Sequence, residues 1–146
     1  MIRTILTLLA LAACAEAQSY TWRETLDAIR VVETGGEPNE GIGAVGDRGA
    51  AIGPYQIHRV YHVDSAERDS TLTDYRRCLL SKEYSERVVR AYMHRYARAA
   101  LLRLEAGTGT LADVEQISRI HNGGPRGASK DATLAYWRKV RGEVTR

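Results

Sequence analysis

Glu33 is the residue of this sequence whose position best suits acid–base chemistry. It takes the next place on an apolar helical stripe of Trp22, Leu26 and Ile29, which recur at spacings of four and three. Such a position directs the carboxyl group toward the interior, where burial favours the protonated form that a general acid needs. The alternative is a solvated carboxylate one residue beyond the packed turn, although negative charge is slightly unfavourable at a helix C-terminus.

Asp47 is the candidate for a second carboxylate. Gly46 and Gly49 flank it and allow the backbone to bend around a bound chain. Two carboxyl groups that flank a glycosidic bond perform glycoside hydrolysis. The configuration of the anomeric carbon is retained when the two carboxyl groups are about 5 Å apart and inverted when they are about 6.5–9.5 Å apart. Gly-Asp-Arg-Gly is also common turn chemistry, and Glu37 and Glu40 are rival second acids.

The types of residue that line a polysaccharide groove also occur in the sequence. Sugar rings need planar apolar faces, and their N-acetyl and hydroxyl groups need amide or hydroxyl partners. Tyr55, Gln56, His121 and Asn122 supply these types. The alternatives are core packing after a turn for Tyr55 and Ile57, and a helix C-cap with a left-handed Asn for His121 and Asn122.

Other reactive side chains indicate neither a metal nor a cofactor, and we expect none. His58 and His62 lie four positions apart, but Arg59 stands where the metalloprotease pattern needs Glu. Cys78 lacks a catalytic Cys–His signature, so we expect a buried or idle thiol. After export it would lack a disulfide partner, because Cys14 is either removed or lipidated.

Capping patterns mark the helices that must position these residues. Thr21–Glu24 is a capping-box pattern that begins a helix, and Gly35-Gly36 ends it. Residues 34–53 are rich in glycine and predict a loop that allows a small hairpin. Pro54 favours a short helix through Ile57 to about residue 66, and another short helix is expected near residues 75–80.

The second half of the chain predicts three further helices. The longest covers 81–106, with Gly107 as its cap and an inward stripe of Tyr84, Val88, Tyr92, Tyr96 and Ala99. Another begins at Thr110, with Leu111, Val114 and Ile117 inward, and is broken at 121–125. The last covers about 130–140, with Leu134 and Trp137 inward. We therefore expect one mainly α domain of about five helices beside a glycine-rich loop or hairpin.

Length and composition agree with one globular domain. The chain has 146 residues, of which 44% are hydrophobic and 27% are charged, which excludes a disordered chain, a collagen-like repeat or a disulfide-dense miniprotein. The net charge of +3 suits an anionic polymer. A solvated basic face is expected on the longest helix, formed by Arg87, Arg90, Arg95, Arg98 and Arg103. No motif supports nucleic-acid binding.

The first residues resemble an export signal. Arg3 precedes an apolar run over 5–13, and Ala15-Glu16-Ala17 fits a cleavage site, so we expect a signal peptide at 1–17 and a mature domain at 18–146. Leu11–Cys14 also fits a lipobox, which would remove 1–13 and lipidate Cys14. The expected location is secreted or periplasmic, and the lipid at Cys14 would be the sole membrane attachment.

Several blocks of the sequence resemble invertebrate-type (destabilase-like) lysozymes, in that family's order. They are residues 33–36 (ETGG), 52–57 (IGPYQI), 92–96 (YMHRY), 120–125 (IHNGGP) and 133–137 (TLAYW). The resemblance extends from Trp22 to Val140. The first, second and fourth blocks resemble lytic transglycosylases more loosely. Family members are rich in disulfides, whereas this chain is not.

The resemblance implies an α+β lysozyme-like fold and roles for particular residues. Glu33 matches the family's general acid, and Asp47 matches its second carboxylate. Substrate-binding positions are matched by Tyr55, Gln56, Ile57, His121, Asn122 and Gly123. The implied partner is the glycan strand of peptidoglycan, bound by a monomer, and the implied reaction is hydrolysis of its β-1,4 bonds.

Three interpretations of the function remain open from the sequence. The first is a muramidase that uses both carboxyl groups. The second is a lytic transglycosylase, in which Glu33 alone acts and 1,6-anhydro products form. The third is a non-catalytic wall-binding module on the same fold. We find no nucleophile, base and orienting group that would support isopeptidase activity.

Overall fold

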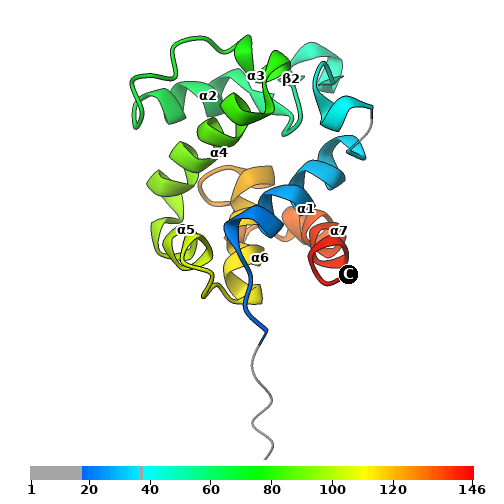
Figure 1. Cartoon of the computed structure of the whole chain (residues 1–146), viewed down its shortest axis with the longest axis vertical. Helices are drawn as coiled ribbons and strands as arrows, with labels where there is room; N and C mark the ends of the chain where they lie inside the picture. Colours follow the sequence, from blue (N-terminus) through cyan, green and yellow to red (C-terminus); the bar gives the residue numbers. More distant parts are fainter. Residues whose placement is uncertain (1–17, 37) are drawn as a thin grey trace, which may run out of the picture.

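The computed structural model describes residues 18–36 and 38–146. The expected signal peptide, the lipobox and Glu37 lie outside the described residues. Within them the chain forms seven α-helices and one small antiparallel sheet. Figure 1 shows the sheet, α2 and α3 at one end of the molecule and α5, α6 and α7 at the other, with α1 and α4 linking the two ends. The predicted mainly α class is confirmed, with more helices than expected.

Helix α1 (Trp22–Thr34) confirms the predicted boundaries. The Thr21 hydroxyl accepts from the backbone N–H of Glu24, and the Glu24 carboxylate accepts from the backbone N–H of Thr21. Gly35 ends the helix in the left-handed conformation with φ 71°. Leu26 and Ile29 are buried, so the apolar stripe faces the core and carries Glu33 toward the sheet end of the molecule.

The glycine-rich segment forms a three-stranded sheet of order β1-β2-β3 rather than a single hairpin. Its strands are β1 (Val45–Gly46), β2 (Ala51–Ile52) and β3 (Ile57–His58). The predicted helix start at Pro54 is wrong, because α2 covers only Arg59–Ala66. The reason is a turn in which Gln56 has φ 45° and donates its N–H to the Gly53 carbonyl, after which Ile57 pairs with Ile52.

The predicted single helix over 81–106 is also wrong. The chain forms α4 (Lys82–Tyr96) and α5 (Arg98–Glu105), separated at Ala97 by φ −146°. The bend allows α5 to pack against α6, with Leu101 and Leu104 fully buried. Ala99, which the stripe placed inward, is exposed. The short helix expected near 75–80 is α3 (Arg77–Leu80).

Helix α6 (Leu111–Gly123) begins with the predicted capping box of Thr110 and Asp113. It ends later than expected, because Asn122 is helical and the chain leaves the helix at Gly124 with φ 78°. Helix α7 (Leu134–Val144) also begins later than expected, after a 3₁₀ turn. The 3₁₀ turns of the described chain are Asn39–Gly41, Asp47–Gly49, Gly127–Ser129 and Asp131–Thr133.

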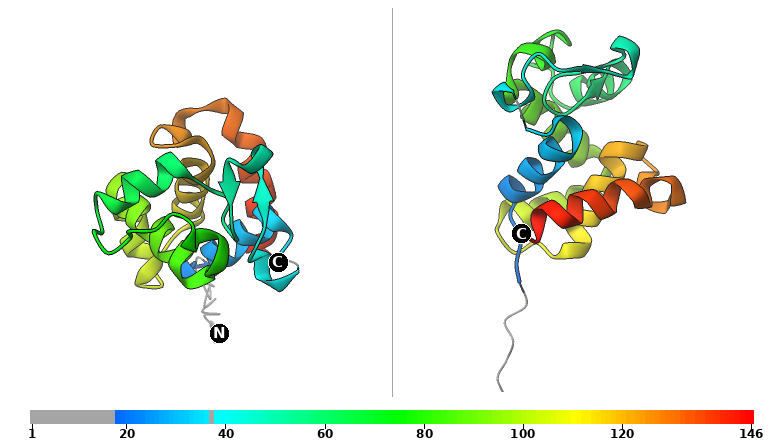
Figure 2. Two further views of the ribbon diagram at one scale, coloured as in Figure 1. Left: turned by 90° about the horizontal axis from the view of Figure 1, so that it is seen from above. Right: turned by 90° about the vertical axis from the view of Figure 1, so that its right-hand side faces the viewer.

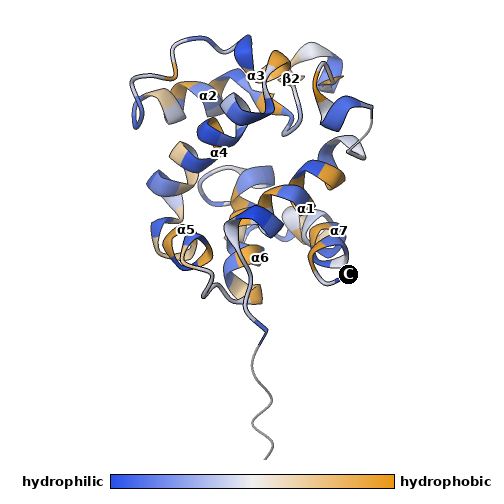
Figure 3. Cartoon of the chain, viewed as in Figure 1, coloured by the Kyte–Doolittle hydropathy of each residue, from blue (hydrophilic) through white to orange (hydrophobic). Residues whose placement is uncertain are grey.

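The core lies between α1, α4, α5, α6 and α7. Val88, Leu101, Ile117 and Val140 are fully buried there. Figure 2 shows how the helices are arranged in two further views, and Figure 3 shows hydrophobic residues along them. Cys78 is buried as predicted, and burial raises the pKa of its thiol to about 12. None of the helices described here is long and apolar enough to cross a membrane.

Candidate active site

A pocket of about 300 Å³ lies where the end of α1 meets the sheet, α2 and the end of α6. Its lining residues are Glu33, Asp47, Ala51, Gln56, His58, Tyr61, His121 and Asn122. The fold therefore brings the two predicted carboxyl groups, the Gln side chain and the His-Asn pair to one depression. These residues come from three separate parts of the sequence, namely the end of α1, the segment 47–61 and the end of α6.

Glu33 lies on the wall between this pocket and the core, with 17% of its side chain exposed. Its Oε1 accepts a hydrogen bond of 2.7 Å from the Tyr136 hydroxyl on α7. The same oxygen lies 3.3 Å from Nε2 of His121. Both neighbours contact Oε1, so Oε2 is the oxygen that remains for a proton exchanged with a ligand in the pocket.

The imidazole of His121 has its tautomer set by its neighbours. Nε2 lies 3.1 Å from the Tyr55 carbonyl oxygen, which can only accept, so Nε2 carries a proton. That N–H is directed at the Tyr55 carbonyl, and Glu33 Oε1 lies 3.3 Å from the same nitrogen. Nδ1 lies 3.2 Å from the Tyr61 hydroxyl. Both ring nitrogens are thus held by neighbouring groups, and Nε2 lies against the Glu33 carboxyl group.

The two phenols around this pair remain protonated. Burial is the main cause that raises the pKa of Tyr136, and the nearby Glu33 carboxylate raises it further. Burial likewise raises the pKa of Tyr61, with added contributions from Tyr92 and Glu33. Both hydroxyl groups therefore act as hydrogen-bond donors at neutral pH.

Asp47 has a different environment from Glu33, since 66% of its side chain is exposed. It begins the 3₁₀ turn Asp47–Gly49 with φ 46°, a strained conformation for a residue that is not glycine. Nε2 of His58 lies 3.7 Å from its Oδ2. Two carboxyl groups that line one pocket in different surroundings can take different roles, one as the proton donor and the other as the anion.

Glu40, the rival second acid, does not line this pocket. Its carboxylate lies 2.6 Å from the Lys82 ammonium. The hydrogen bond from Lys82 is the main cause that lowers the pKa of Glu40. Glu40 is therefore committed to an ion pair on the surface.

Gln56 reaches the pocket through an unusual backbone conformation. Its φ of 45° turns the side chain back over the sheet, where Nε2 donates to the Gly53 carbonyl over 2.9 Å. A Cβ on Gly46 would lie 2.1 Å from Gln56 Oε1. A side chain at position 46 would therefore force the Gln56 carboxamide to move.

Three predicted binding residues do not line the pocket. Tyr55 and Ile57 are fully buried, because the turn before β3 directs both side chains into the core. The Tyr55 hydroxyl donates to Glu86, so the prediction of a groove-wall aromatic is wrong. Gly123 faces the 3₁₀ turn Asp131–Thr133 instead, since a Cβ there would lie 2.5 Å from Thr133 Cγ2.

Sequence reasoning missed Tyr61 and Tyr136. Tyr136 stands one position before Trp137, but no local pattern connects it with Glu33. His58 was considered only as a metal ligand with His62, and the two do not face one site. His62 is buried against the Tyr84 hydroxyl at 3.0 Å, whereas His58 is exposed. Over the residues described, no cluster of His, Cys, Asp and Glu suited to a metal ion occurs.

Comparison with known proteins gives one consistent family. The sequence profile of the Destabilase family matches residues 24–142. Invertebrate-type lysozyme 6 of Caenorhabditis elegans is 34% identical over 136 residues, covering 88% of this chain and 91% of that protein. Lysozyme 1 of Crassostrea virginica is 34% identical over 122 residues, covering 83% of this chain and 59% of that protein.

Solved structures give the same result. The lysozyme of Tapes japonica superposes with a TM-score of 0.63 and 28% identity, covering 86% of this chain and 92% of that one. The inhibitor-bound lysozyme of Meretrix lusoria superposes with a TM-score of 0.62 and 29% identity, covering 86% and 93% of the two chains. The family match over residues 24–142 includes Glu33, His121 and Tyr136.

Proposed function

Because the chain belongs to the destabilase family of invertebrate-type lysozymes, we propose that Glu33 is its general acid and Asp47 its second carboxylate. The chain is a muramidase, a glycoside hydrolase that cleaves the β-1,4 bonds between N-acetylmuramic acid and N-acetylglucosamine in peptidoglycan. The observation that carries the assignment of roles is the shared pocket, in which a shielded Glu33 and an exposed Asp47 both take part.

The role of Glu33 rests on its contacts. Tyr136 and His121 both approach Oε1, which orients the carboxyl group and leaves Oε2 toward the pocket. Glu33 would give its proton to the glycosidic oxygen as the bond to the leaving sugar breaks. The resulting carboxylate would still accept the hydrogen bond from the Tyr136 hydroxyl, which stabilises its negative charge.

Asp47 would act on the other reacting centre. Positive charge develops at the anomeric carbon in the transition state, and an ionised carboxylate beside it either stabilises that charge or attacks the carbon. The exposure of Asp47 supports an ionised carboxylate, because water stabilises the charged form. Gln56 and Asn122 would bind the N-acetyl and hydroxyl groups of the sugars.

Export is part of the same proposal. The A-x-A pattern at 15–17 supports a mature chain that begins at residue 18, and the lipobox supports lipidation at Cys14 as the alternative. Intact mass of the exported protein distinguishes a free N-terminus from a lipidated one. We expect the mature chain to be a monomer, which size-exclusion chromatography tests.

The decisive experiment compares Glu33→Gln with Glu115→Gln in a cell-wall turbidity assay. Glu115 lies on α6 in a partly exposed ion pair with Arg119 and does not line the pocket, so its replacement removes the same charge outside the site. Glu33→Gln should lower the lysis rate by about 10²- to 10⁴-fold, whereas Glu115→Gln should lyse as the wild type does. Equal lysis by Glu33→Gln would reject the mechanism. Pelleting with cell wall, without lysis by the wild type, would identify a binding module.

A further inference from the structure

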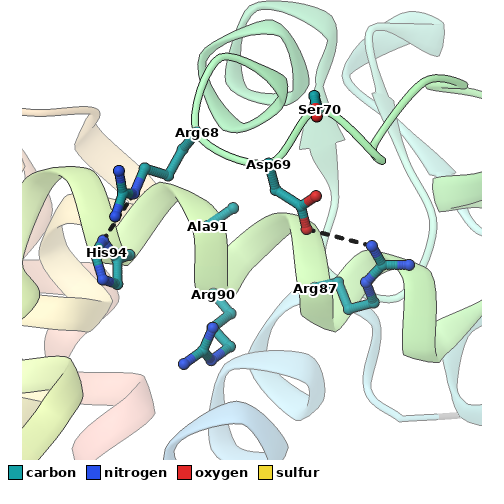
Figure 4. A pocket seen from close by; sticks show the side chains of 7 residues that line it. All are labelled: Arg68, Asp69, Ser70, Arg87, Arg90, Ala91 and His94. Carbon is teal, nitrogen blue, oxygen red and sulfur yellow. Dashed lines mark hydrogen bonds and ion pairs between the residues drawn. The ribbon is translucent and has the colours of Figure 1, made fainter.

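A second pocket, of about 440 Å³, lies between α4 and the segment that follows α2. It is lined by Arg68, Asp69, Ser70, Arg87, Arg90, Ala91 and His94, none of which lines the Glu33 pocket. Figure 4 shows Arg68 above α4, and Arg87, Arg90 and His94 arranged along the helix around the small side chain of Ala91.

Helix α4 separates the two pockets. Arg87, Arg90, Ala91 and His94 occur at spacings of three, one and three, so they share one helical face. Tyr92 lies on the other side of the helix and stacks on Tyr61 of the Glu33 pocket at 3.6 Å. A ligand in the second pocket would therefore not occupy the catalytic one.

Two of the three arginines that line this pocket are paired with carboxylates. Arg87 lies 3.2 Å from Asp69, and Arg90 forms an ion pair with Glu105 at the edge of the pocket. Arg68 differs from both. Within 18–36 and 38–146 no carboxylate lies within ion-pair distance of Arg68, and its Nε donates to Nδ1 of His94 over 3.0 Å.

The contact between Arg68 and His94 places a permanent cation against a basic ring. Desolvation by burial is the main cause that lowers the pKa of His94, followed by the charges of Arg68, Arg98 and Arg90, and Glu105 opposes them. Three guanidinium groups therefore stand around one depression with two carboxylates at its sides. The remaining positive charge favours an anion at this place.

We propose that this pocket is a binding site for a phosphate group. Guanidinium groups bind oxyanions through paired N–H donors, and a phosphate offers more acceptor oxygens than a carboxylate to arginines that approach from two elements. Arg68 is the principal ligand, because its terminal nitrogens form no hydrogen bond with the described residues. Arg87 and Arg90 add donors from α4, and Ser70 adds a hydroxyl.

The phosphate site would serve for attachment rather than for catalysis. A phosphate bound behind α4 would hold the enzyme on a phosphate-bearing polymer or surface while the Glu33 pocket remains open to glycan. The proposal does not depend on the catalytic roles of Glu33 and Asp47, because the two pockets share no residue.

The test is an NMR titration of the ¹⁵N-labelled chain with inorganic phosphate, a soluble glycerol-phosphate oligomer and acetate, at constant ionic strength. The two phosphate probes should give saturable shifts at Arg68, Ala91 and His94. Arg68→Gln should weaken phosphate binding about tenfold or more, since a charge-assisted hydrogen bond is lost. This variant leaves no carboxylate unpaired, so it should fold normally and retain basal lysis.

The matched control is Arg138→Gln, which removes the same charge from an exposed position of α7. It should bind phosphate as the wild type does. If both variants weaken phosphate binding equally, the effect comes from net charge alone and the proposed site is wrong. Unsaturated shifts, or shifts as large with acetate, would also overturn it. Tighter binding of the oligomer supports a polymer as the source of the phosphate, and equal binding supports the free ion.

Discussion

The Tyr136 hydroxyl donates a hydrogen bond of 2.7 Å to Oε1 of Glu33, across 103 positions of the sequence. The contact is made possible because α7 packs along α1, so the two side chains meet at the border of the pocket. His121 approaches the same oxygen from α6. The carboxyl group is therefore oriented by two helices that do not carry it, and its orientation depends on the packing of the core.

The first prediction concerns Tyr136→Phe, which removes the hydroxyl and keeps the ring. We expect kcat for wall lysis to fall about ten- to a hundredfold with a smaller change in KM, because a hydrogen bond to a charged group contributes about 1.5–3 kcal/mol. The control is Tyr96→Phe, which removes a hydrogen bond of 2.9 Å to the Asp64 carboxylate away from the pocket. If both variants lyse walls equally well, Tyr136 is a structural residue only.

The second prediction separates Asp47 from its rival Glu40. Asp47→Asn should lower wall lysis by about 10²- to 10³-fold, because the electrostatic stabilisation of the developing positive charge is lost. Glu40→Gln should have little effect, since its carboxylate is paired with Lys82 on the surface. The opposite ranking of the two variants would assign the second role to Glu40.

Analysis of the products extends this test to the mechanism. Mass spectrometry of digested wall should show reducing ends for the wild type, as a hydrolase requires. Products with 1,6-anhydro ends, together with full activity of Asp47→Asn, would instead identify a transglycosylase in which Glu33 acts alone.

Local patterns predicted the two capping boxes well and the packing of the site poorly. The capping boxes at Thr21 and Thr110 depend on residues three positions apart, so the sequence contains all the information needed. The break at Ala97 has no glycine or proline to mark it and follows from the packing of Leu101 and Leu104. Helical periodicity alone therefore predicted one long helix.

The candidate site divides in the same way. Glu33 was found because its place on the α1 stripe is a local property. Tyr55 was expected in the groove because its residue type suits a sugar, yet the turn at Gln56 buries it. Tyr136 was missed because only the packing of α7 on α1 brings it to Glu33. Contacts between helices that are distant in sequence cannot be predicted from the spacing of residues along the chain.

The third prediction uses Gly46→Ala to displace Gln56 without changing it. The new methyl group would lie 2.1 Å from the present position of Gln56 Oε1, so the carboxamide must move. We expect KM to rise about two- to tenfold with little change in kcat, as the loss of a neutral hydrogen bond implies. The control is Gly142→Ala on α7, which meets open space. It should raise the unfolding free energy by about 0.5–1 kcal/mol and leave KM unchanged, whereas an unchanged KM for Gly46→Ala would exclude Gln56 from substrate binding.

The last prediction concerns acid stability through Asp113, the capping-box residue of α6. Its Oδ2 accepts from Arg103 Nε over 3.0 Å, and this contact is the main cause that lowers its pKa below the ordinary value of 3.8. A lowered pKa in the folded state stabilises the protein above about pH 3.8, and the contribution is lost as the pH falls through the folded pKa. Asp113→Asn should therefore reduce the free energy of unfolding by about 1 kcal/mol near pH 7, and the gap from the wild type should narrow at a pH below the folded-state pKa. Urea unfolding at both pH values measures the gap, and a gap that is independent of pH would show that the charge of Asp113 does not stabilise the fold.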